Sequence, residues 1–133
     1  MARIASGGEL SRIHLAMRAV LRDRQGSARG LTLLFDEVDS GIGGKVADEL
    51  GELLAEQGRR HQVLVVTHLP QVAGRAQSHF VVAKKSAGGR TVTRVDAVSG
   101  EARVDELLRM LGGAETPAAR QHARELLQRP PAC

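Results

Sequence analysis

Residues 31–44 read LTLLFDEVDSGIGG, and this stretch decides the fold of the chain. It opens with a short apolar run, 31–35, that ends abruptly in Asp36 and Glu37. A run of this length that is followed directly by acids predicts a β-strand buried on both faces. We therefore expect two carboxylates at the C-terminal end of a buried strand.

A connecting helix and a second strand follow this stretch. Residues 62–67 read QVLVVT and predict another buried strand, with His68 directly behind it. Strand, helix and strand in this order form half of a parallel α/β sheet. Ligands of such sheets bind at the carboxyl ends of the strands, where Asp36, Glu37 and His68 all fall. The helix between the strands is marked by apolar residues at helical spacing: Val46, Leu50, Leu53 and Leu54.

The N-terminal part of the chain predicts a capped helix. Residues 6–9, Ser-Gly-Gly-Glu, have the pattern of a capping box, in which a hydroxyl and a carboxylate satisfy free backbone N–H groups at a helix start. Apolar residues then recur at helical spacing to about Arg24. Residues 25–30 are rich in glycine and polar residues and predict a loop.

The C-terminal half changes character. Pro70 suits the first turn of a short helix that we expect to run through residue 76. Residues 80–83 and 91–95 read as strands on either side of Ala-Gly-Gly at 87–89, which predicts a hairpin. Two helices complete the prediction, one over 101–111 that Gly112 closes and one that begins at Thr116-Pro117 and ends near Gln128.

Length and composition exclude several classes of protein. The 133 residues fit one domain or a piece of one, and 42% hydrophobic residues suffice for a compact core. No apolar run approaches the roughly 18–20 residues that cross a bilayer, so we expect no membrane contact. The first residues lack the apolar region of a secretory signal. A single cysteine, Cys133, excludes a disulfide scaffold or a multi-cysteine zinc site and suits the cytoplasm.

Charge is distributed in uneven blocks. Residues 1–35 carry +4, residues 36–58 carry −6, and residues 59–95 hold seven Lys or Arg and no acid. Such blocks indicate a surface where cations face a polyanion near a carboxylate cluster, although folding can also intermix them in space. With two Phe and no Trp or Tyr, stacking on bases is disfavoured. Any contact with DNA is therefore expected to involve the phosphates.

Residues 33–37 have the form of a Walker B strand, an apolar strand that ends in two acids. One carboxylate would hold Mg²⁺, and the other would act on the attacking water. The chemistry needs two acids because the one committed to the metal cannot also accept or polarise a proton. The alternative is an acid that caps the following helix, a role open to Asp36 or Asp39.

Two further motifs point to phosphate binding. Glycines at a helix start let an anion approach the free N–H groups, so residues 6–9 predict an anion site, with an ordinary capped helix as the alternative. His68 would donate to a γ-phosphate oxygen beside Glu37, with a structural histidine as the alternative. The remaining histidines have no comparable setting and are interpreted as surface or packing residues: His14, His61, His79 and His122.

Gly43-Gly44-Lys45 does not form a Walker A motif. The phosphate loop G-x-x-x-x-G-K-[ST] requires glycine at position 39 and serine or threonine at position 46, where this chain has Asp39 and Val46. No other segment supplies the motif. We therefore expect the chain alone to hydrolyse no ATP.

The three motifs come in one order: Ser-Gly-Gly-Glu at a helix start, then strand-Asp-Glu-x-Asp-Ser-Gly, then strand-Thr-His. This order resembles the C-terminal part of an ABC-type ATPase head, with signature motif, Walker B, D-loop and switch histidine. The amino-acid sequences of three segments are more specific than this order: residues 5–12, 34–44 and 66–73. They resemble the RecN family of bacterial DNA repair ATPases, which are related to the structural-maintenance-of-chromosomes (SMC) proteins. The resemblance covers almost the whole chain. It implies an α/β fold in which residues 1–133 form the C-terminal lobe of an ABC-type P-loop ATPase head, without the coiled coil and the N-terminal lobe that carries Walker A.

The resemblance implies a role for each motif residue. Asp36 would hold Mg²⁺, Glu37 would orient the hydrolytic water, and His68 would contact the γ-phosphate of ATP. Asp39 would belong to the D-loop, which crosses the interface between two heads. The signature motif would contact a nucleotide held mainly by the other head, and it comprises Ser6, Gly7, Gly8 and Glu9.

The resemblance also implies a function. The protein would act in recombinational repair of double-strand breaks through ATP-driven head dimerisation and hydrolysis. Its partners would be a second ATPase head, DNA and the recombination machinery, in the cytoplasm and nucleoid of a bacterium. One alternative is the nucleotide-binding subunit of a transporter, which Glu9 in place of glutamine disfavours. Another is a non-catalytic module that binds a partner head or DNA.

Overall fold

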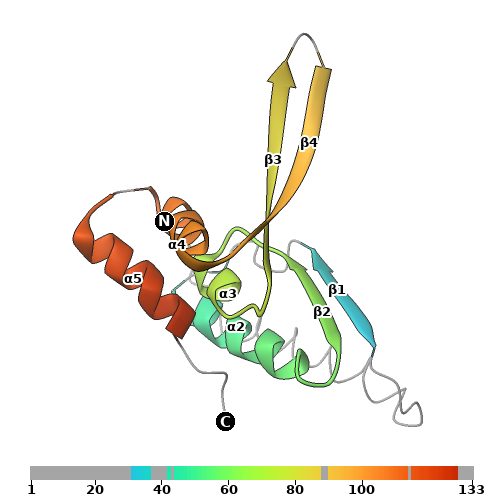
Figure 1. Ribbon diagram of the computed structural model, residues 1–133. Helices are drawn as coiled ribbons and strands as arrows, with labels where there is room; N and C mark the ends of the chain where they lie inside the picture. The colour runs from blue at the N-terminus through green and yellow to red at the C-terminus, as the bar shows by residue number, and fades with distance from the viewer. Residues whose placement is uncertain (1–30, 37–41, 43, 88–89, 114, 129–133) are drawn as a thin grey trace.

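Figure 1 shows the computed structural model of the chain, which describes residues 31–36, 42, 44–87, 90–113 and 115–128. The expectations for residues 1–30, including the capped helix and the signature motif, lie outside the described residues. Those for Glu37 and Asp39 lie outside them as well. The described part is a mixed α/β structure in which two parallel strands and their helices precede a hairpin and two C-terminal helices, as predicted.

The predicted strand, helix and strand are confirmed. Strand β1 (Thr32–Asp36) pairs in parallel with β2 (Gln62–Val66), in a register that sets Asp36 opposite Val66. Helix α2 (Lys45–Gln57) connects the two strands and packs against one face of the pair. Since a parallel connection needs a crossover, α2 is what allows the two strands to run in the same direction. Residues of the core between helix and strands are Ala47, Leu50, Leu54, Leu69 and Val72, with Phe35, Ile42, Val63 and Val65 packed against them.

The prediction that both strands are buried on both faces is wrong. Successive side chains of a strand point to opposite faces of a sheet. On the outer face, Leu34, Leu64 and Val66 are 70%, 47% and 59% exposed. On the inner face, Phe35 and Val65 pack on α2 and are half-buried. The described residues supply a helix for one face of this sheet, and the other face stays in contact with solvent.

A second core lies in the C-terminal half, where α3 (Pro70–Gly74), α4 (Gly100–Met110) and α5 (Pro117–Gln128) meet. Pro70 begins α3 as predicted, and α3 ends two residues earlier than expected. In the part of the chain that the structure describes, no helix is long and apolar enough to cross a membrane. The buried residues of this core are Ala73, Val104, Leu107, Leu108, Ala123 and Leu126.

Arg103 on α4 contacts the C-terminal end of α3 and the residues just after it. Its Nη2 donates to the carbonyl oxygens of Ala73 at 3.1 Å, Gly74 at 3.4 Å and Ala76 at 2.5 Å. The last carbonyls of a helix have no partner within the helix, and a cation there also opposes the negative end of the helix dipole. The guanidinium therefore adds a charged donor at the end of α3, where the Ala73 carbonyl also accepts from the Ala76 N–H at 3.3 Å.

Helices α3 and α5 approach closely at Gly74. A Cβ atom placed there would lie 3.0 Å from the carbonyl oxygen of Leu126 and 3.1 Å from its Cβ. Real Cβ atoms rarely come so close to backbone. Glycine at this position is thus required by the packing of two helices and not by the conformation of its own backbone.

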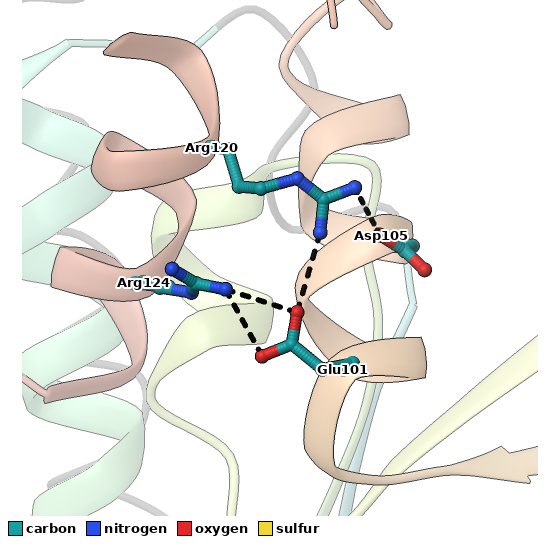
Figure 2. A network of polar contacts seen from close by, with 4 residues as sticks. All are labelled: Glu101, Asp105, Arg120 and Arg124. Atoms are coloured by element: carbon teal, nitrogen blue, oxygen red, sulfur yellow. Dashed lines mark hydrogen bonds and ion pairs between the residues drawn. The ribbon is translucent and has the colours of Figure 1, made fainter. Parts of the chain in front are cut away.

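Ion pairs join α4 to α5 on their exposed side, as Figure 2 shows. Glu101 lies 3.3 Å from Arg120 and 3.1 Å from Arg124, and Asp105 lies 2.8 Å from Arg120. All four side chains are at least 38% exposed, so each pair contributes at most about 1 kcal/mol. The network fixes the relative orientation of the helices more than it stabilises the fold.

The predicted hairpin is present and is longer than expected. Strands β3 (His79–Ala87) and β4 (Arg90–Val98) pair antiparallel over nine residues each, against the predicted 80–83 and 91–95. In Figure 1 the ribbon rises away from the helices as an arm. The ladder continues through polar residues because backbone hydrogen bonds, and not buried side chains, hold its outer half together.

Candidate functional site

The parallel register brings two of the predicted site residues to one edge of the sheet. Asp36 is the last residue of β1 and lies opposite Val66, the last residue of β2. His68 follows Val66 by two residues. Both Asp36 and His68 are exposed. This is the carboxyl edge, where ligands of parallel sheets bind, and both side chains are accessible there.

A turn of four residues positions His68. The Thr67 hydroxyl Oγ1 accepts a hydrogen bond from the Leu69 N–H at 3.0 Å. Leu69 has extended backbone (φ −89°, ψ 118°), and Pro70 then starts α3, where its missing N–H costs nothing and its φ already suits a helix. Leu69 and Pro70 are both buried. His68 is therefore held between a strand end and a buried helix start.

The opposite edge of the sheet is closed by a different histidine. His61 Nδ1 accepts from the Leu31 N–H at 3.1 Å, and the Gln62 N–H donates to the Leu31 carbonyl at 2.8 Å. These bonds begin the β1–β2 ladder, at the end that lies away from Asp36. The interpretation of His61 as a packing residue agrees with this place.

After Asp36, the next described residues are Ile42 and Gly44, which lead into α2. Ile42 packs on the core beneath α2, and Gly44 precedes that helix with φ +57°. Glycine adopts this left-handed conformation without strain. The Asp48 N–H donates to the Gly44 carbonyl at 3.3 Å and begins the helical hydrogen bonding. In the sequence, Glu37 and Asp39 lie between two described residues, Asp36 and Ile42.

The donor set at this edge suits a hard cation that is held mainly by other groups. Within residues 31–36, 42 and the later described ranges, no group of three His, Cys, Asp or Glu side chains forms a metal site. Among the described residues, Asp36 is the one that offers a carboxylate at the end of β1. Mg²⁺ in nucleotide enzymes is held by one or two carboxylates, with phosphate oxygens and water as the other ligands. A single exposed carboxylate therefore fits Mg²⁺ and does not fit a structural metal.

A second group of titratable residues lies at the base of the hairpin. Burial lowers the pKa of His79, and the charge of Arg103 lowers this pKa further, while Glu106 opposes both effects. His79 Nδ1 is buried without a hydrogen-bond partner. A bidentate hydrogen bond from Arg109, at 2.7 and 2.8 Å, holds the pKa of Glu106 below its usual value. This group supports packing and does not face the edge with Asp36.

Sequence reasoning missed two sets of residues. Arg103 was not singled out, because the carbonyls that it binds lie nearly 30 residues earlier in the chain. The sequence predicts an excess of positive charge over residues 59–95. It does not predict that cations of this block lie together on a protruding hairpin. For the hairpin a signal existed: Lys84, Lys85 and Arg90 surround the Gly-Gly turn.

The fold is similar to part of a solved SMC ATPase structure. A solved structure from work on the structural biochemistry of ATP-driven dimerization and DNA-stimulated activation of SMC ATPases superposes with a TM-score of 0.55. The superposition covers 84% of this chain and 62% of that one, at 20% identity. At this identity the likeness shows the fold alone.

The particular relatives are DNA repair proteins named RecN. The chain is 52% identical over 128 residues to RecN of Mycobacterium leprae, 48% over 124 residues to that of Deinococcus radiodurans, and 42% over 129 residues to that of Bacillus subtilis. The resemblance to RecN predicted from the motifs is thereby confirmed. These matches cover 93–96% of this chain and only 21–22% of each relative, so the chain spans about a fifth of their length. No family model matches the chain.

Proposed function

We propose that this chain acts as the C-terminal lobe of a RecN-like ATPase head in the recombinational repair of double-strand breaks. The observation that carries the proposal is the likeness to RecN over nearly the whole chain, at 42–52% identity. The placement of Asp36 and His68 at one carboxyl edge supports it, because a nucleotide site of this fold class needs its polar groups there. Head dimerisation driven by ATP, followed by hydrolysis, is the activity proposed for the larger protein.

Three residues divide the work at this edge. When bound, Mg²⁺ neutralises phosphate charge, and Asp36 is the residue proposed to hold it. Glu37 is adjacent to Asp36 in sequence and is proposed to orient the attacking water. His68 is proposed to donate to an oxygen of the γ-phosphate. Its fixed place before α3 supports this role, since a donor contributes most when it needs no reorganisation.

The site is proposed to be completed by a second head. Asp39 would lie in the D-loop at the interface of the two heads. The signature motif, Ser6, Gly7, Gly8 and Glu9, would meet the γ-phosphate of a nucleotide held mainly by the partner, because glycines at a helix start admit an anion to free N–H groups. This arrangement would make hydrolysis depend on dimerisation.

The cellular setting of the proposal follows from the relatives. RecN proteins are bacterial DNA repair proteins by name, so we place this chain in the bacterial cytoplasm, at the nucleoid. DNA is proposed to be bound through its phosphates, and the recombination machinery is the proposed wider partner. A transporter subunit is disfavoured by the RecN likeness. A non-catalytic module that binds a head or DNA is the second candidate, and the sequence favours it in one respect, since it has no Walker A pattern.

A chimera tests the proposal. The residues of this chain replace the matching segment of Mycobacterium leprae RecN, the 52% identical relative, and ATP binding, turnover and dimer mass are measured. Glu37→Gln should leave ATP binding nearly intact and reduce turnover by roughly 10²–10⁴-fold, the loss expected for a general base. Asp36→Asn should instead weaken the Mg²⁺-dependent part of binding. The matched control is Glu56→Gln on the exposed side of α2, which should turn over ATP like the wild type.

Dimer formation separates the two candidate functions. With ATP, dimers should accumulate in the Glu37→Gln chimera, and Ser6→Arg should abolish them by steric block. If Glu37→Gln hydrolyses ATP at the wild-type rate, then Glu37 does not act on the attacking water and the catalytic proposal is wrong. If the chimera dimerises but neither carboxylate variant affects turnover, the non-catalytic module is the better description.

A further inference from the structure

The β3–β4 hairpin protrudes as an arm. Among the described residues, the side chains of its outer half are all exposed. At about 3.3 Å per residue, nine residues in each strand give an arm of roughly 30 Å. At its base Val81, Ala83 and Val98 are half-buried. From Lys84 outward, every described side chain of the hairpin is exposed as far as Val95. The outer half is therefore a surface without a core function.

Cations are concentrated on this outer half. Lys84 and Lys85 lie near the end of β3, and Arg90 and Arg94 lie at the start of β4. The single acid of the hairpin, Asp96, pairs with Arg94, whose Nε lies 2.7 Å from Asp96 Oδ1. The register sets Lys84 and Lys85 on opposite faces of the ribbon. Both faces of the arm thus present positive charge.

The cations of the arm differ from most other cations of the fold. Among the described residues, Lys84, Lys85 and Arg90 make no ion pair, and neither do Arg60 in the turn after α2 and Arg103, which binds backbone carbonyls. A group of three unpaired cations on a protruding arm is complementary to an extended polyanion. The other ion pairs of Lys and Arg among these residues include Lys45 with Glu49, Arg75 with Glu52, Arg109 with Glu106, Arg120 with both Asp105 and Glu101, and Arg124 with Glu101.

The hydroxyl side chains of the outer half, which stand beside the exposed Val92 and Val95, favour the backbone of a duplex over single-stranded bases. Ser86 Oγ and Thr91 Oγ1 lie 3.0 Å apart across the ribbon, and Thr93 is exposed beside them. Hydroxyls bind phosphate oxygens, whereas single-stranded bases are held by aromatic stacking. The aromatic residue of the hairpin, Phe80, lies at its base. A two-stranded ribbon is also of a width that the major groove of B-DNA admits.

We propose that the outer half of the β3–β4 hairpin, residues 84–86 and 90–94, binds the phosphate backbone of double-stranded DNA. The choice of DNA as the polyanion rests on the proposed function, while the location rests on the hairpin itself. Binding depends on salt and is independent of base sequence.

Lysine footprinting tests the location in the unmodified chain. The sequence contains three lysines, Lys84 and Lys85 on the arm and Lys45 at the start of α2, which is 90% exposed and serves as an internal control. A short mixed-sequence duplex should slow acetylation of Lys84 and Lys85 severalfold and leave Lys45 unchanged. Equal protection of all three lysines, or protection of Lys45 alone, would overturn the proposal.

Matched double variants test the energetics. Lys85→Gln with Arg90→Gln should weaken duplex binding by roughly tenfold or more and reduce the slope of log affinity against log salt by about two, since each phosphate contact contributes roughly 0.9. Lys45→Gln with Arg60→Gln removes the same two charges elsewhere and should change the affinity by less than about twofold. Equal losses in both variants would mean that only net charge matters, which contradicts the proposal.

Two further outcomes separate this proposal from its neighbours. If poly-L-glutamate binds as tightly as the duplex and depends on Lys85 and Arg90 in the same way, the arm recognises an acidic protein and the DNA assignment is wrong. In the chimera, the double variant Lys85→Gln with Arg90→Gln should still form ATP-dependent dimers. Loss of DNA binding can therefore be measured independently of loss of ATPase activity. If the Glu37→Gln test fails, the protection of Lys84 and Lys85 from acetylation still stands, because that measurement does not depend on ATP hydrolysis.

Discussion

The guanidinium of Arg103 lies 3.1 Å from the carbonyl oxygen of Ala73 and so fastens α4 to the end of α3. One Nη2 atom serves three carbonyls of the same chain segment. Burial lowers the pKa of Arg103 from its ordinary value, which shows that the charge is partly withdrawn from water. The carbonyls replace the hydration that Nη2 loses, while Nε is buried without a hydrogen-bond partner.

Removal of this guanidinium should destabilise the fold. Arg103→Met keeps the apolar stem and removes the charged donor that the carbonyls of Ala73, Gly74 and Ala76 share, so the free energy of unfolding should fall by about 1.5–3 kcal/mol, the range for hydrogen bonds to charged groups. Urea titration measures the loss. Arg60→Met, at an exposed arginine, is the control and should change stability by less than about 0.5 kcal/mol. A loss as small as that of the control would show that Arg103 does not hold α3.

A methyl group at Gly74 should be costly. Gly74→Ala would bring a Cβ within 3.0 Å of the Leu126 carbonyl oxygen and force α5 away from α3. Overpacking of this kind costs about 1–3 kcal/mol. The comparison is Gly58→Ala, where φ is −61° and alanine fits the helical backbone, so stability should stay the same or rise by up to about 1 kcal/mol. Thermal unfolding of both variants decides the matter, and equal melting temperatures would argue against a close α3–α5 contact.

His79 should make stability depend on pH. Its pKa in the folded chain is lowered from 6.5, mainly by burial and then by Arg103, so the unfolded state binds more protons. Stability should therefore fall as the pH drops below about 6.5, until the folded pKa is passed. His79→Gln should flatten this part of the profile, as measured by urea unfolding at a series of pH values. Parallel profiles for the two proteins would refute the assignment.

The isolated chain should release no phosphate from ATP above background. The phosphate loop normally supplies the lysine and the backbone N–H groups around the β- and γ-phosphates, and the sequence has no such motif. Phosphate release is measured for the wild type and for Glu37→Ala. Turnover in the wild type that disappears in Glu37→Ala would reveal a complete site and contradict the prediction.

Local signals were enough to predict most of the described elements. The apolar runs located β1 and β2, Pro70 and Pro117 located the starts of α3 and α5, and the carboxyl edge with Asp36 and His68 followed from the strand order. These features depend on neighbours in sequence. Glu37, Asp39 and the signature motif remain predictions, because the described residues do not include them.

Features that depend on distant partners could not be predicted. The apolar composition of β1 says that Leu34 suits burial, but whether a layer covers it depends on the rest of the molecule, and here Leu34 is 70% exposed. The contact between Arg103 and the end of α3 joins residues nearly 30 positions apart in the chain. The predicted strand 80–83 was too short because Lys84 and Lys85, which continue β3, carry no apolar signal.

Helix α3 has a consequence for how the molecule comes apart. A helix of five residues is far shorter than the roughly 12–15 that an isolated helix needs, so α3 exists only while its surroundings hold it. Val72 belongs to one core and its neighbour Ala73 to the other. Neither half can therefore melt without withdrawing support from the other, and unfolding should be a single cooperative event. A truncation that removes α5 would on this account disorder the turn at His68, nearly fifty residues away in the sequence.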